Sequence, residues 1–342
     1  MSELFDAIND VPVQINIWIR PECQKKQFEV IRQARPSILF IVSDGGRNEE
    51  EWAAIRQNRA LYENGIDWKC DVHKIYFDTN QGMYQTAIKA YEIIWSMVDY
   101  CIFMEDDIVP SLSFFPFCKE LLEKYRDDER VNMIAGFNHL NNYERPSADY
   151  FFSQQAILWG YATWKRVYEQ FYDFHYGKDP YVMDLLNHET RNHETLRKKI
   201  NAYADHDYYQ GHLAFEEYFL EFGTYAYRQL NIIPTRNLCA NIGATENSAH
   251  FTELQYQPKA IRKIFNSPTY TYEFPLKHPD YFIPDYYYDR KVHEINADNG
   301  FINKTKRQIE RKYLYIKSGK SITAGAKRII KRKLSNNKEL ES

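Results

Sequence analysis

Short apolar runs alternate with helical patterns over the first 140 residues, and this alternation restricts the fold more than any other feature of the chain. The apolar runs have the length of strands and are residues 13–18, 38–42, 72–77, 101–104 and 131–137. Helical patterns lie between them, at about residues 25–35, 48–65, 87–98 and a segment after 111. Because continuous apolar runs are typical of buried parallel strands, this order predicts an α/β fold with a doubly wound, mostly parallel, Rossmann-like sheet.

Polar or glycine-containing turns follow the first four predicted strands. They are Arg20-Pro21-Glu22, Ser43-Asp44-Gly45-Gly46-Arg47, Asp78-Thr79-Asn80-Gln81-Gly82 and Glu105-Asp106-Asp107. In an open α/β sheet, ligands bind at the edge where the carboxyl ends of the parallel strands meet. Carboxylates at this edge suit Mg²⁺ or Mn²⁺, which in turn suits a diphosphate. The layout therefore predicts a nucleotide site, although an acidic triplet taken alone more often forms a solvated turn.

The middle of the chain combines aromatic residues with a long polar segment. Gly160 interrupts the run 150–164 just before a predicted helix, so Trp159, Tyr161 and Trp164 fit either a buried core or an aromatic platform near the ligand edge. Residues 170–212 are polar and rich in His and Asn, and they predict short helices of an acceptor-side insertion. Residues 232–240 predict a strand that Pro234 breaks.

The composition excludes several classes of protein. A chain of 342 residues fits one large α/β domain, or such a domain plus an extension. No apolar run approaches the length of a membrane span and no basic residue precedes Arg20, so the sequence predicts neither a secretory signal nor an anchor and favours the cytosol. The five cysteines lack metal-binding spacing, which argues against a disulfide framework and against zinc.

Charge is distributed unevenly along the chain. Residues 303–334 contain twelve Lys or Arg against one Glu, a net charge of +11, which leaves −14 for the rest because the whole chain carries −3. Within this tail, residues 322–334 place apolar side chains on one helical face and basic ones mostly on the other. We therefore expect residues 303–334 to bind an anionic membrane surface, at the inner face of the cytoplasmic membrane. A solvated disordered tail fits the charge equally well, whereas the acidic body argues against nucleic-acid binding.

Seven sequence blocks occur together in a fixed order. They are Arg20-Pro21-Glu22, Ser43-Asp44-Gly45-Gly46-Arg47, Asn80-Gln81-Gly82, Glu105-Asp106-Asp107 with Phe114-Phe115 after it, Trp159-Gly160-Tyr161-Ala162-Thr163-Trp164, Asn237-Leu238-Cys239-Ala240-Asn241-Ile242-Gly243 and Ser248-Ala249-His250. With these blocks the chain resembles bacterial nucleotide-sugar glycosyltransferases of the GT-A fold, of the surface-polysaccharide type. More remotely it resembles the N-acetylglucosaminyltransferase I family, which also carries Glu-Asp-Asp.

The likeness covers about residues 11–255. It implies a GT-A domain at residues 1–255, with a donor half at 11–140 and an acceptor half at 141–255. A C-terminal helical basic extension follows at 256–342.

The resemblance implies a metal-dependent, inverting transfer of a sugar from a nucleotide-diphospho-sugar, with a UDP-sugar favoured, to a glycan or lipid-linked acceptor in surface-polysaccharide synthesis. It implies that Mn²⁺ or Mg²⁺ is held by Asp107 and His250. It places Asp44 near the base, Arg20 near the nucleotide or diphosphate, and Asp106 near the ribose or the sugar. The remaining donor-site residues that it implies are Gly45, Arg47, Asn80, Gly82, Glu105, Trp159 and Gly160.

The catalytic base is expected from the segment before Asn237. Relatives carry Trp-Asp-Tyr there, whereas this chain carries Glu216-Glu217-Tyr218, and counting back from Asn237 puts Glu217 at the position of the aspartate. An inverting transfer needs one carboxylate to take the proton of the acceptor hydroxyl, and both Glu216 and Glu217 stay candidates.

Two other functions fit the same pattern. One is a sugar-nucleotide nucleotidyltransferase, which also uses a doubly wound sheet and metal-binding carboxylates. The lack of a Gly-rich basic loop near the N-terminus argues against it. The other is a non-catalytic binding protein on a transferase fold, with the basic tail as an interaction arm.

Overall fold

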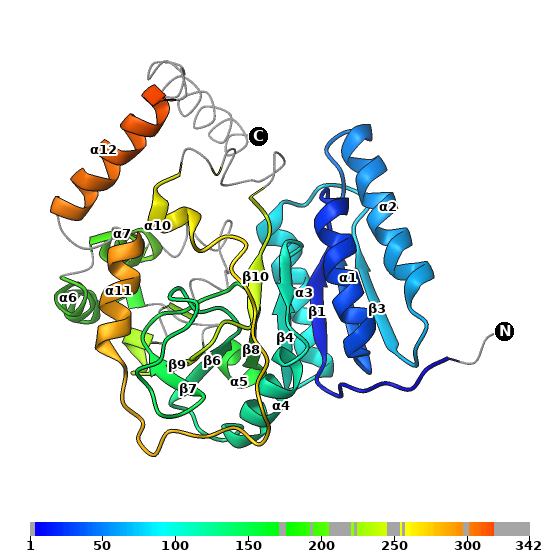
Figure 1. Cartoon of the computed structure of the whole chain (residues 1–342), viewed down its shortest axis with the longest axis horizontal. Coiled ribbons are helices and arrows are strands. Elements are labelled where there is room, and N and C mark those ends of the chain that lie inside the picture. The colour runs from blue at the N-terminus through cyan, green and yellow to red at the C-terminus, as the bar shows by residue number, and fades with distance from the viewer. Residues whose placement is uncertain are drawn as a thin grey trace.

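The computed structural model describes residues 4–170, 176–191, 194–204, 220–221, 224–244, 254, 257–296 and 301–317 (Figure 1). The strands of its main sheet are β1 (Val13–Asn16), β2 (Ile38–Ser43), β3 (Asp71–Tyr76), β4 (Tyr100–Met104), β6 (Val131–Ala135), β7 (Tyr150–Ser153), β8 (Tyr161–Trp164) and β9 (Leu230–Pro234). Two further strands, β5 (Ile108–Pro110) and β10 (Cys239–Asn241), pair with each other in a separate antiparallel sheet.

The helices fall into three groups along the chain. Those of the first half are α1 (Pro21–Ala34), α2 (Glu49–Gly65), α3 (Met83–Met97) and α4 (Phe114–Lys124). The middle of the chain has α5 (Lys165–Glu169), the 3₁₀ helix η1 (Tyr176–Lys178), α6 (Pro180–Glu189) and α7 (Glu194–Tyr203), which confirms the predicted short helices of residues 170–212 where they are described. The last group is α10 (Lys259–Arg262), α11 (Tyr286–Asn296) and α12 (Phe301–Lys317).

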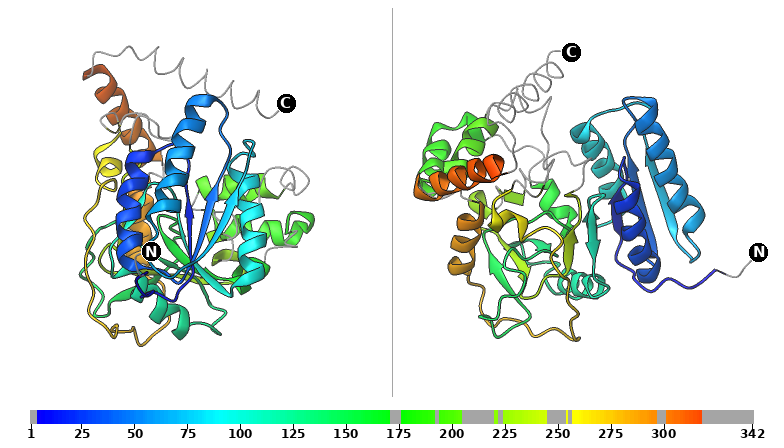
Figure 2. Two further views of the ribbon diagram at one scale, coloured as in Figure 1. Left: turned by 90° about the vertical axis from the view of Figure 1, so that its right-hand side faces the viewer. Right: turned by 45° about the horizontal axis from the view of Figure 1, so that its top comes forward.

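The main sheet has the strand order β3-β2-β1-β4-β8-β6-β9-β7. Pairings β3–β2, β2–β1, β1–β4 and β6–β9 are parallel, while β8 and β7 run antiparallel to their neighbours. Helices α1 and α2 cover one face of the sheet and α3 covers the other (Figure 2). The α/β class and the doubly wound, mostly parallel sheet predicted for a GT-A-type fold are confirmed.

Local sequence explains where the first helices begin. Pro21 occupies the first turn of α1, where the missing backbone N–H costs nothing, so the helix starts directly after Arg20 and four residues earlier than its apolar pattern indicates. The side chain of Asn48 accepts a hydrogen bond from the backbone of Glu51, which confirms the predicted start of α2.

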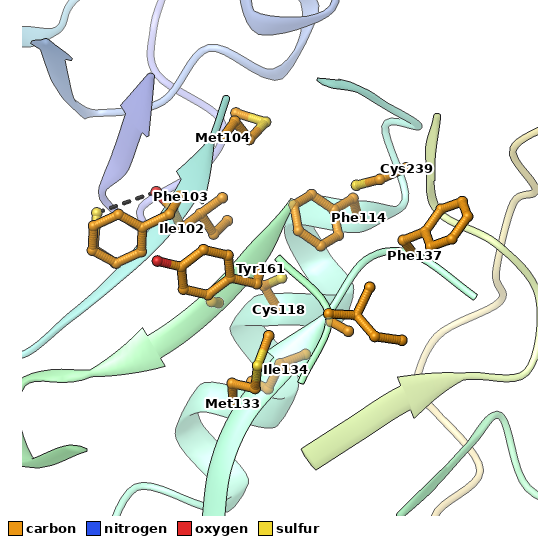
Figure 3. Packing of buried hydrophobic residues seen from close by; sticks show 14 of the residues in the cluster. Ile102, Phe103, Met104, Phe114, Cys118, Met133, Ile134, Phe137, Tyr161 and Cys239 are labelled. Atoms are coloured by element: carbon orange, nitrogen blue, oxygen red, sulfur yellow. Dashed lines mark hydrogen bonds between the residues drawn. The ribbon is translucent and has the colours of Figure 1, made fainter. Parts of the chain in front are cut away.

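The core lies between the sheet and its helices, and it takes up most of the aromatic residues of the 150–164 run. The rings of Phe103 on β4 and Tyr161 on β8 are stacked with centroids 5.2 Å apart (Figure 3). Tyr161 and Trp164 are both buried, so of the two possibilities left open by the sequence, these residues belong to the core.

The segment after residue 255 packs on the main sheet before the chain reaches α12. The backbone of Asp285 donates to the carbonyl of Phe152 on β7, and Tyr288 on α11 is fully buried. Helix α12 confirms a helical, basic extension over residues 301–317, whereas the predicted amphipathic segment 322–334 lies outside the described residues. In the described parts of the chain, no helix has both the length and the apolar character needed to cross a membrane.

Pro234 interrupts the strand that the sequence predicts over residues 232–240. Pro234 ends β9, and the chain resumes as β10 in the small sheet, which confirms the predicted break. All five cysteines are free, and four of them are buried.

Gly160 and Gly82 both have a positive φ, but only Gly160 is tightly packed, so the two positions separate the cost of backbone strain from the cost of overpacking. Gly160 has a φ of 74° and Gly82 a φ of 81°. A methyl group on Gly160 would lie 2.6 Å from Cys239 Sγ and 3.1 Å from Ile108 Cγ2, whereas nothing lies within 4 Å of the corresponding position on Gly82.

We predict that Gly160→Ala lowers the free energy of unfolding by about 2–6 kcal/mol, since it adds overpacking to an unfavourable φ, each at about 1–3 kcal/mol. Gly82→Ala should lose only the part due to φ. Urea denaturation of both variants measures the difference, and equal losses would show that the packing around Gly160 contributes nothing.

Candidate functional site

The carboxyl ends of β1, β2, β3 and β4 meet at one edge of the sheet because these strands are parallel neighbours. The polar turns predicted for this edge follow each of these strands in the structure. They divide into an acidic cluster after β1 and β4 and a pair of joined loops after β2 and β3.

Arg20 binds both aspartates that follow β4. Its Nε donates to Asp106 Oδ2 at 2.9 Å, its Nη2 donates to Asp106 Oδ1, and its Nη1 donates to Asp107 Oδ2 at 2.8 Å. The three side chains are only 13%, 9% and 11% exposed. Arg20 precedes α1 directly, so the start of this helix aims the guanidinium at a turn 86 residues further along the chain.

Two glutamines of α1 hold the backbone of that turn. Gln24 Nε2 donates to the carbonyl of Asp106 at 2.9 Å, and Gln27 Nε2 donates to the carbonyls of Glu105 at 2.7 Å and Ile108 at 2.8 Å. Both glutamines are fully buried. Neither glutamine was predicted from the sequence to support the site, although two glutamines on the buried face of a helix indicate buried backbone partners.

The Asn-Ile-Gly block lies against the same turn. The backbone N–H of Ile242 donates to the carbonyl of Asp107 at 2.9 Å, and β10 pairs with β5 directly beyond the aspartates. A methyl group on Gly243 would lie 1.8 Å from Asp107 Oδ2 and 2.7 Å from Arg20 Nη1. Only glycine therefore lets this backbone approach the Arg20–Asp107 pair so closely.

Burial dominates the titration of the cluster. It raises the pKa of Asp106 to about 6, against the opposing charge of Arg20 and with a smaller contribution from Asp107. Burial also raises the pKa of Asp107, and Arg20 opposes that shift as well. Burial alone would lower the pKa of Arg20, but the two carboxylates raise it, so the guanidinium stays charged.

With both aspartates ionised, the three side chains carry a net charge of −1 and one carboxylate oxygen remains unused. Asp107 Oδ1 is buried and has no hydrogen-bond partner among the described residues. Buried anionic oxygens are costly without a cation or a donor. This oxygen therefore fits a divalent cation held by one carboxylate, which is common for Mg²⁺ where substrate phosphates complete the coordination.

The other predicted metal ligand, His250, lies outside the described residues. Within the described residues, no group of three or more His, Cys, Asp or Glu side chains could hold a metal ion. Asp106 has both oxygens occupied by Arg20, so Asp107 is the carboxylate of the pair with a free coordination position.

The loops after β2 and β3 are joined through Asp44. Its Oδ1 accepts from the backbone of Gly45 and Gln81, both at 2.8 Å, and its Oδ2 accepts from Asn80 Nδ2 and the backbone of Gly82, both at 3.0 Å. Asn80 Nδ2 also donates to the carbonyl of Gly45 at 2.8 Å. Four predicted donor-site residues are thus brought together, with Asp44 as the group that orders both loops.

Arg59 on α2 donates hydrogen bonds to both of these loops. It was not predicted from the sequence. It donates to Ser43 Oγ at 2.9 Å and to the carbonyl of Phe77 at 3.1 Å, and it lies over the ring of Tyr76. An arginine in the middle of a helical pattern gives no sequence indication of such a role.

Arg47 follows β2 in the chain, but its side chain reaches a residue that comes after β1. Its guanidinium is paired with Glu51 at 2.6 Å and lies 5.1 Å from the ring centre of Trp18. Trp18 is half-buried and is the second residue after β1. A flat ring backed by a cation at this edge offers a stacking surface, which the sequence analysis treated only as part of a strand.

The remaining predicted donor-site residues that the structure describes, Trp159, Gly160 and Glu105, lie in different environments. Trp159 packs against Phe137 and Phe265, with ring centres 4.7 and 5.1 Å away. Gly160 lies against Cys239, and the side chain of Glu105 is exposed. The two candidate bases, Glu216 and Glu217, lie outside the described residues.

Comparison with known proteins finds no matching family model and no matching curated protein. Among solved structures, S. aureus TarS (residues 1–349) is 8% identical with a TM-score of 0.33, and the match covers 47% of this chain and 48% of that one. UDP-glucose pyrophosphorylase complexed with UDP-glucose is 11% identical with a TM-score of 0.31, over 50% of this chain and 82% of that one. The bifunctional glycosyltransferase WbbM is 12% identical with a TM-score of 0.23, over 48% of this chain and 28% of that one. The chain thus has remote structural similarity to these proteins, and its function has to be argued from its own residues.

Proposed function

We propose that this protein is a glycosyltransferase that takes a sugar from a nucleotide-diphospho-sugar, with a UDP-sugar favoured, and passes it with inversion to a glycan or lipid-linked acceptor. The observation that carries the proposal is the buried cluster of Arg20, Asp106 and Asp107 at the carboxyl edge of the sheet, with Gly243 against it. A guanidinium and an unused carboxylate oxygen suit a diphosphate together with its metal ion.

Arg20 would serve the diphosphate without leaving the aspartates. Its contacts to Asp106 and Asp107 use three of its N–H groups and leave further donors of the guanidinium for a phosphate oxygen. Gln24 and Gln27 keep the aspartate turn in place, so the guanidinium and the carboxylates hold their relative positions when a ligand binds.

Mn²⁺ or Mg²⁺ held by Asp107 would supply positive charge to the leaving nucleoside diphosphate. The neighbouring strand ends would receive the nucleoside: the loops ordered by Asp44 lie beside the ring of Trp18 and its partner Arg47. We assign the proton acceptor to Glu217, with Glu216 as the alternative, from the sequence alone.

Asp107→Asn tests the metal role. The amide keeps the shape of the side chain but removes its charge, and Arg20 retains Asp106 as a partner, so we expect a folded protein. Its affinity for Mn²⁺ should fall about tenfold or more, since even outer-shell changes at metal sites cost about 10–100-fold. Mn²⁺ titration followed by electron paramagnetic resonance measures this without any substrate, and transfer by the unaltered protein should stop in excess EDTA.

A matched control comes from the opposite edge of the same sheet. Asp71 is exposed at the start of β3, so Asp71→Asn removes an equal charge far from the site and should leave Mn²⁺ affinity unchanged. Equal Mn²⁺ binding by the unaltered protein and Asp107→Asn would rule out Asp107 as a metal ligand.

The two candidate bases are distinguished by parallel substitutions. Glu217→Gln should lower turnover by about 10²–10⁴-fold with donor affinity kept, the usual loss when a general base is removed. Glu216→Gln should have a much smaller effect. Steady-state kinetics with a fixed donor tests both variants, and the reverse order of losses would assign the base to Glu216.

A panel of nucleotide sugars tests the reaction itself. We expect metal-dependent release of a nucleoside diphosphate with at least one donor. A nucleotidyltransferase would instead release pyrophosphate from a nucleoside triphosphate and a sugar 1-phosphate, and a binding protein would retain a nucleotide sugar without turnover. Either of these results would contradict the proposal.

A further inference from the structure

Helix α12 packs on the rest of the protein through its polar side. Lys304 pairs with Glu194 on α7, and Arg307 Nη2 donates to the carbonyl of Ile295 at 2.7 Å. Glu310 Oε1 accepts from the backbone of Lys259 at 2.7 Å. Figures 1 and 2 show α12 at the margin of the molecule, beside α7 and far from α1, α2 and α3.

The opposite side of α12 exposes apolar side chains. Ile302, Ile309, Tyr313 and Ile316 are 68%, 61%, 60% and 62% exposed. Their spacings of seven, four and three residues place them on one side of the helix. We call these four residues the outer stripe.

This orientation is the reverse of the usual one. An amphipathic helix of a globular protein turns its apolar stripe toward the core, because burial of that stripe is what stabilises its docking. Here polar contacts dock the helix, and the outer stripe faces away from the described parts of the protein. An exposed apolar stripe of this kind indicates a surface that binds something else.

Lysines flank the outer stripe on both sides. At 100° per residue, Lys306 and Lys317 lie along one border of the stripe and Lys312 lies along the other. The helix carries six basic residues and one acidic residue, a net charge of +5, which leaves −8 for the rest of a chain of charge −3. Positive charge is therefore concentrated around the stripe and continues into residues 318–334, which add six basic residues and no acidic one, while the chain outside 303–334 carries −14.

These flanking charges decide between two occupants. A second copy of the chain with its stripe against this one would bring lysines toward lysines, and four side chains offer far less than the roughly 800 Å² per partner of a stable interface. An anionic lipid surface supplies both an apolar layer for the stripe and negative charge for the lysines.

We propose that the outer stripe of α12 binds an anionic lipid bilayer, with Lys306, Lys312 and Lys317 at the level of the headgroups. This gives the protein a peripheral membrane contact that belongs to its described fold and does not require residues 322–334. The contact involves no residue of the donor site, so it holds independently of the reaction proposed above.

Vesicle co-sedimentation of the full chain tests the contact. We expect the unaltered protein to pellet with phosphatidylcholine vesicles containing phosphatidylglycerol at low salt, and to be released as salt shortens the range of the charge interaction. Ile309→Ser with Tyr313→Ser should lower the vesicle partition coefficient about tenfold or more, because it removes half of the apolar contact. Lys306→Glu with Lys312→Glu should weaken binding to anionic vesicles by about fivefold or more for each lysine, and binding to neutral vesicles much less.

The matched control uses the same residue types at another exposed place. Tyr281 and Ile283 are 76% and 67% exposed but lie outside α12, so Tyr281→Ser with Ile283→Ser should pellet like the unaltered protein. Three results would overturn the proposal: no pelleting with anionic vesicles, unchanged pelleting of the Ile309/Tyr313 variant, or a dimer in light scattering that this variant dissociates while vesicles retain nothing. The lysine variant decides the question if the apolar variant fails to fold.

Discussion

Burial of two adjacent carboxylates against one guanidinium is the interaction on which the rest of this structure depends. Arg20 reaches Asp106 and Asp107 only because β1 and β4 are neighbours and because α1 begins directly after Arg20. The turn that presents the aspartates has few backbone partners of its own, and Gln24 and Gln27 of the same helix supply them. One helix therefore positions both the cation and the backbone that carries the anions. Loss of the guanidinium would leave two buried charges without compensation, which is far more costly than loss of an exposed pair.

At the same edge of the sheet, a second set of hydrogen bonds orders the loops after β2 and β3. Asp44 accepts four hydrogen bonds from the loops after β2 and β3, and Arg59 holds these loops from the side of α2. Loops at the carboxyl edge of an α/β sheet are where specificity resides, and such loops are useful only if they are held in place. Here the side chains of Asp44 and Arg59 order these loops. The cluster around Arg20 differs, because one of its carboxylate oxygens, Asp107 Oδ1, has no partner among the described residues.

The Arg20 cluster and helix α12 differ in what they expose: the cluster buries its charges, whereas the helix exposes apolar side chains. The cluster of Arg20, Asp106 and Asp107 surrounds its charges with protein, and charges act most strongly on one another and on a ligand where water is excluded. Helix α12 does the opposite, since it turns its apolar side outward and uses polar contacts to stay on the protein. A transferase with a lipid-linked acceptor would need both properties, one for the chemistry and one to remain near the acceptor.

The amino-acid sequence by itself determined the α/β class, the parallel order of the first strands and the polar residues at their ends. These follow from local physics: apolar runs of strand length, helix caps such as Asn48, and Pro21 at the start of α1. It also placed the turns that carry Asp44, Asn80 and Gly82 along the same edge of the sheet, whereas the structure shows that Asp44 joins them. Only the tertiary structure decided that Tyr161 and Trp164 are core, that Gln27 and Arg59 support the site, and that the outer stripe of α12 faces away from the protein. The physical reason is that periodicity gives the face of a helix on which a residue lies, whereas the partner of that face is set by contacts between residues far apart in the chain.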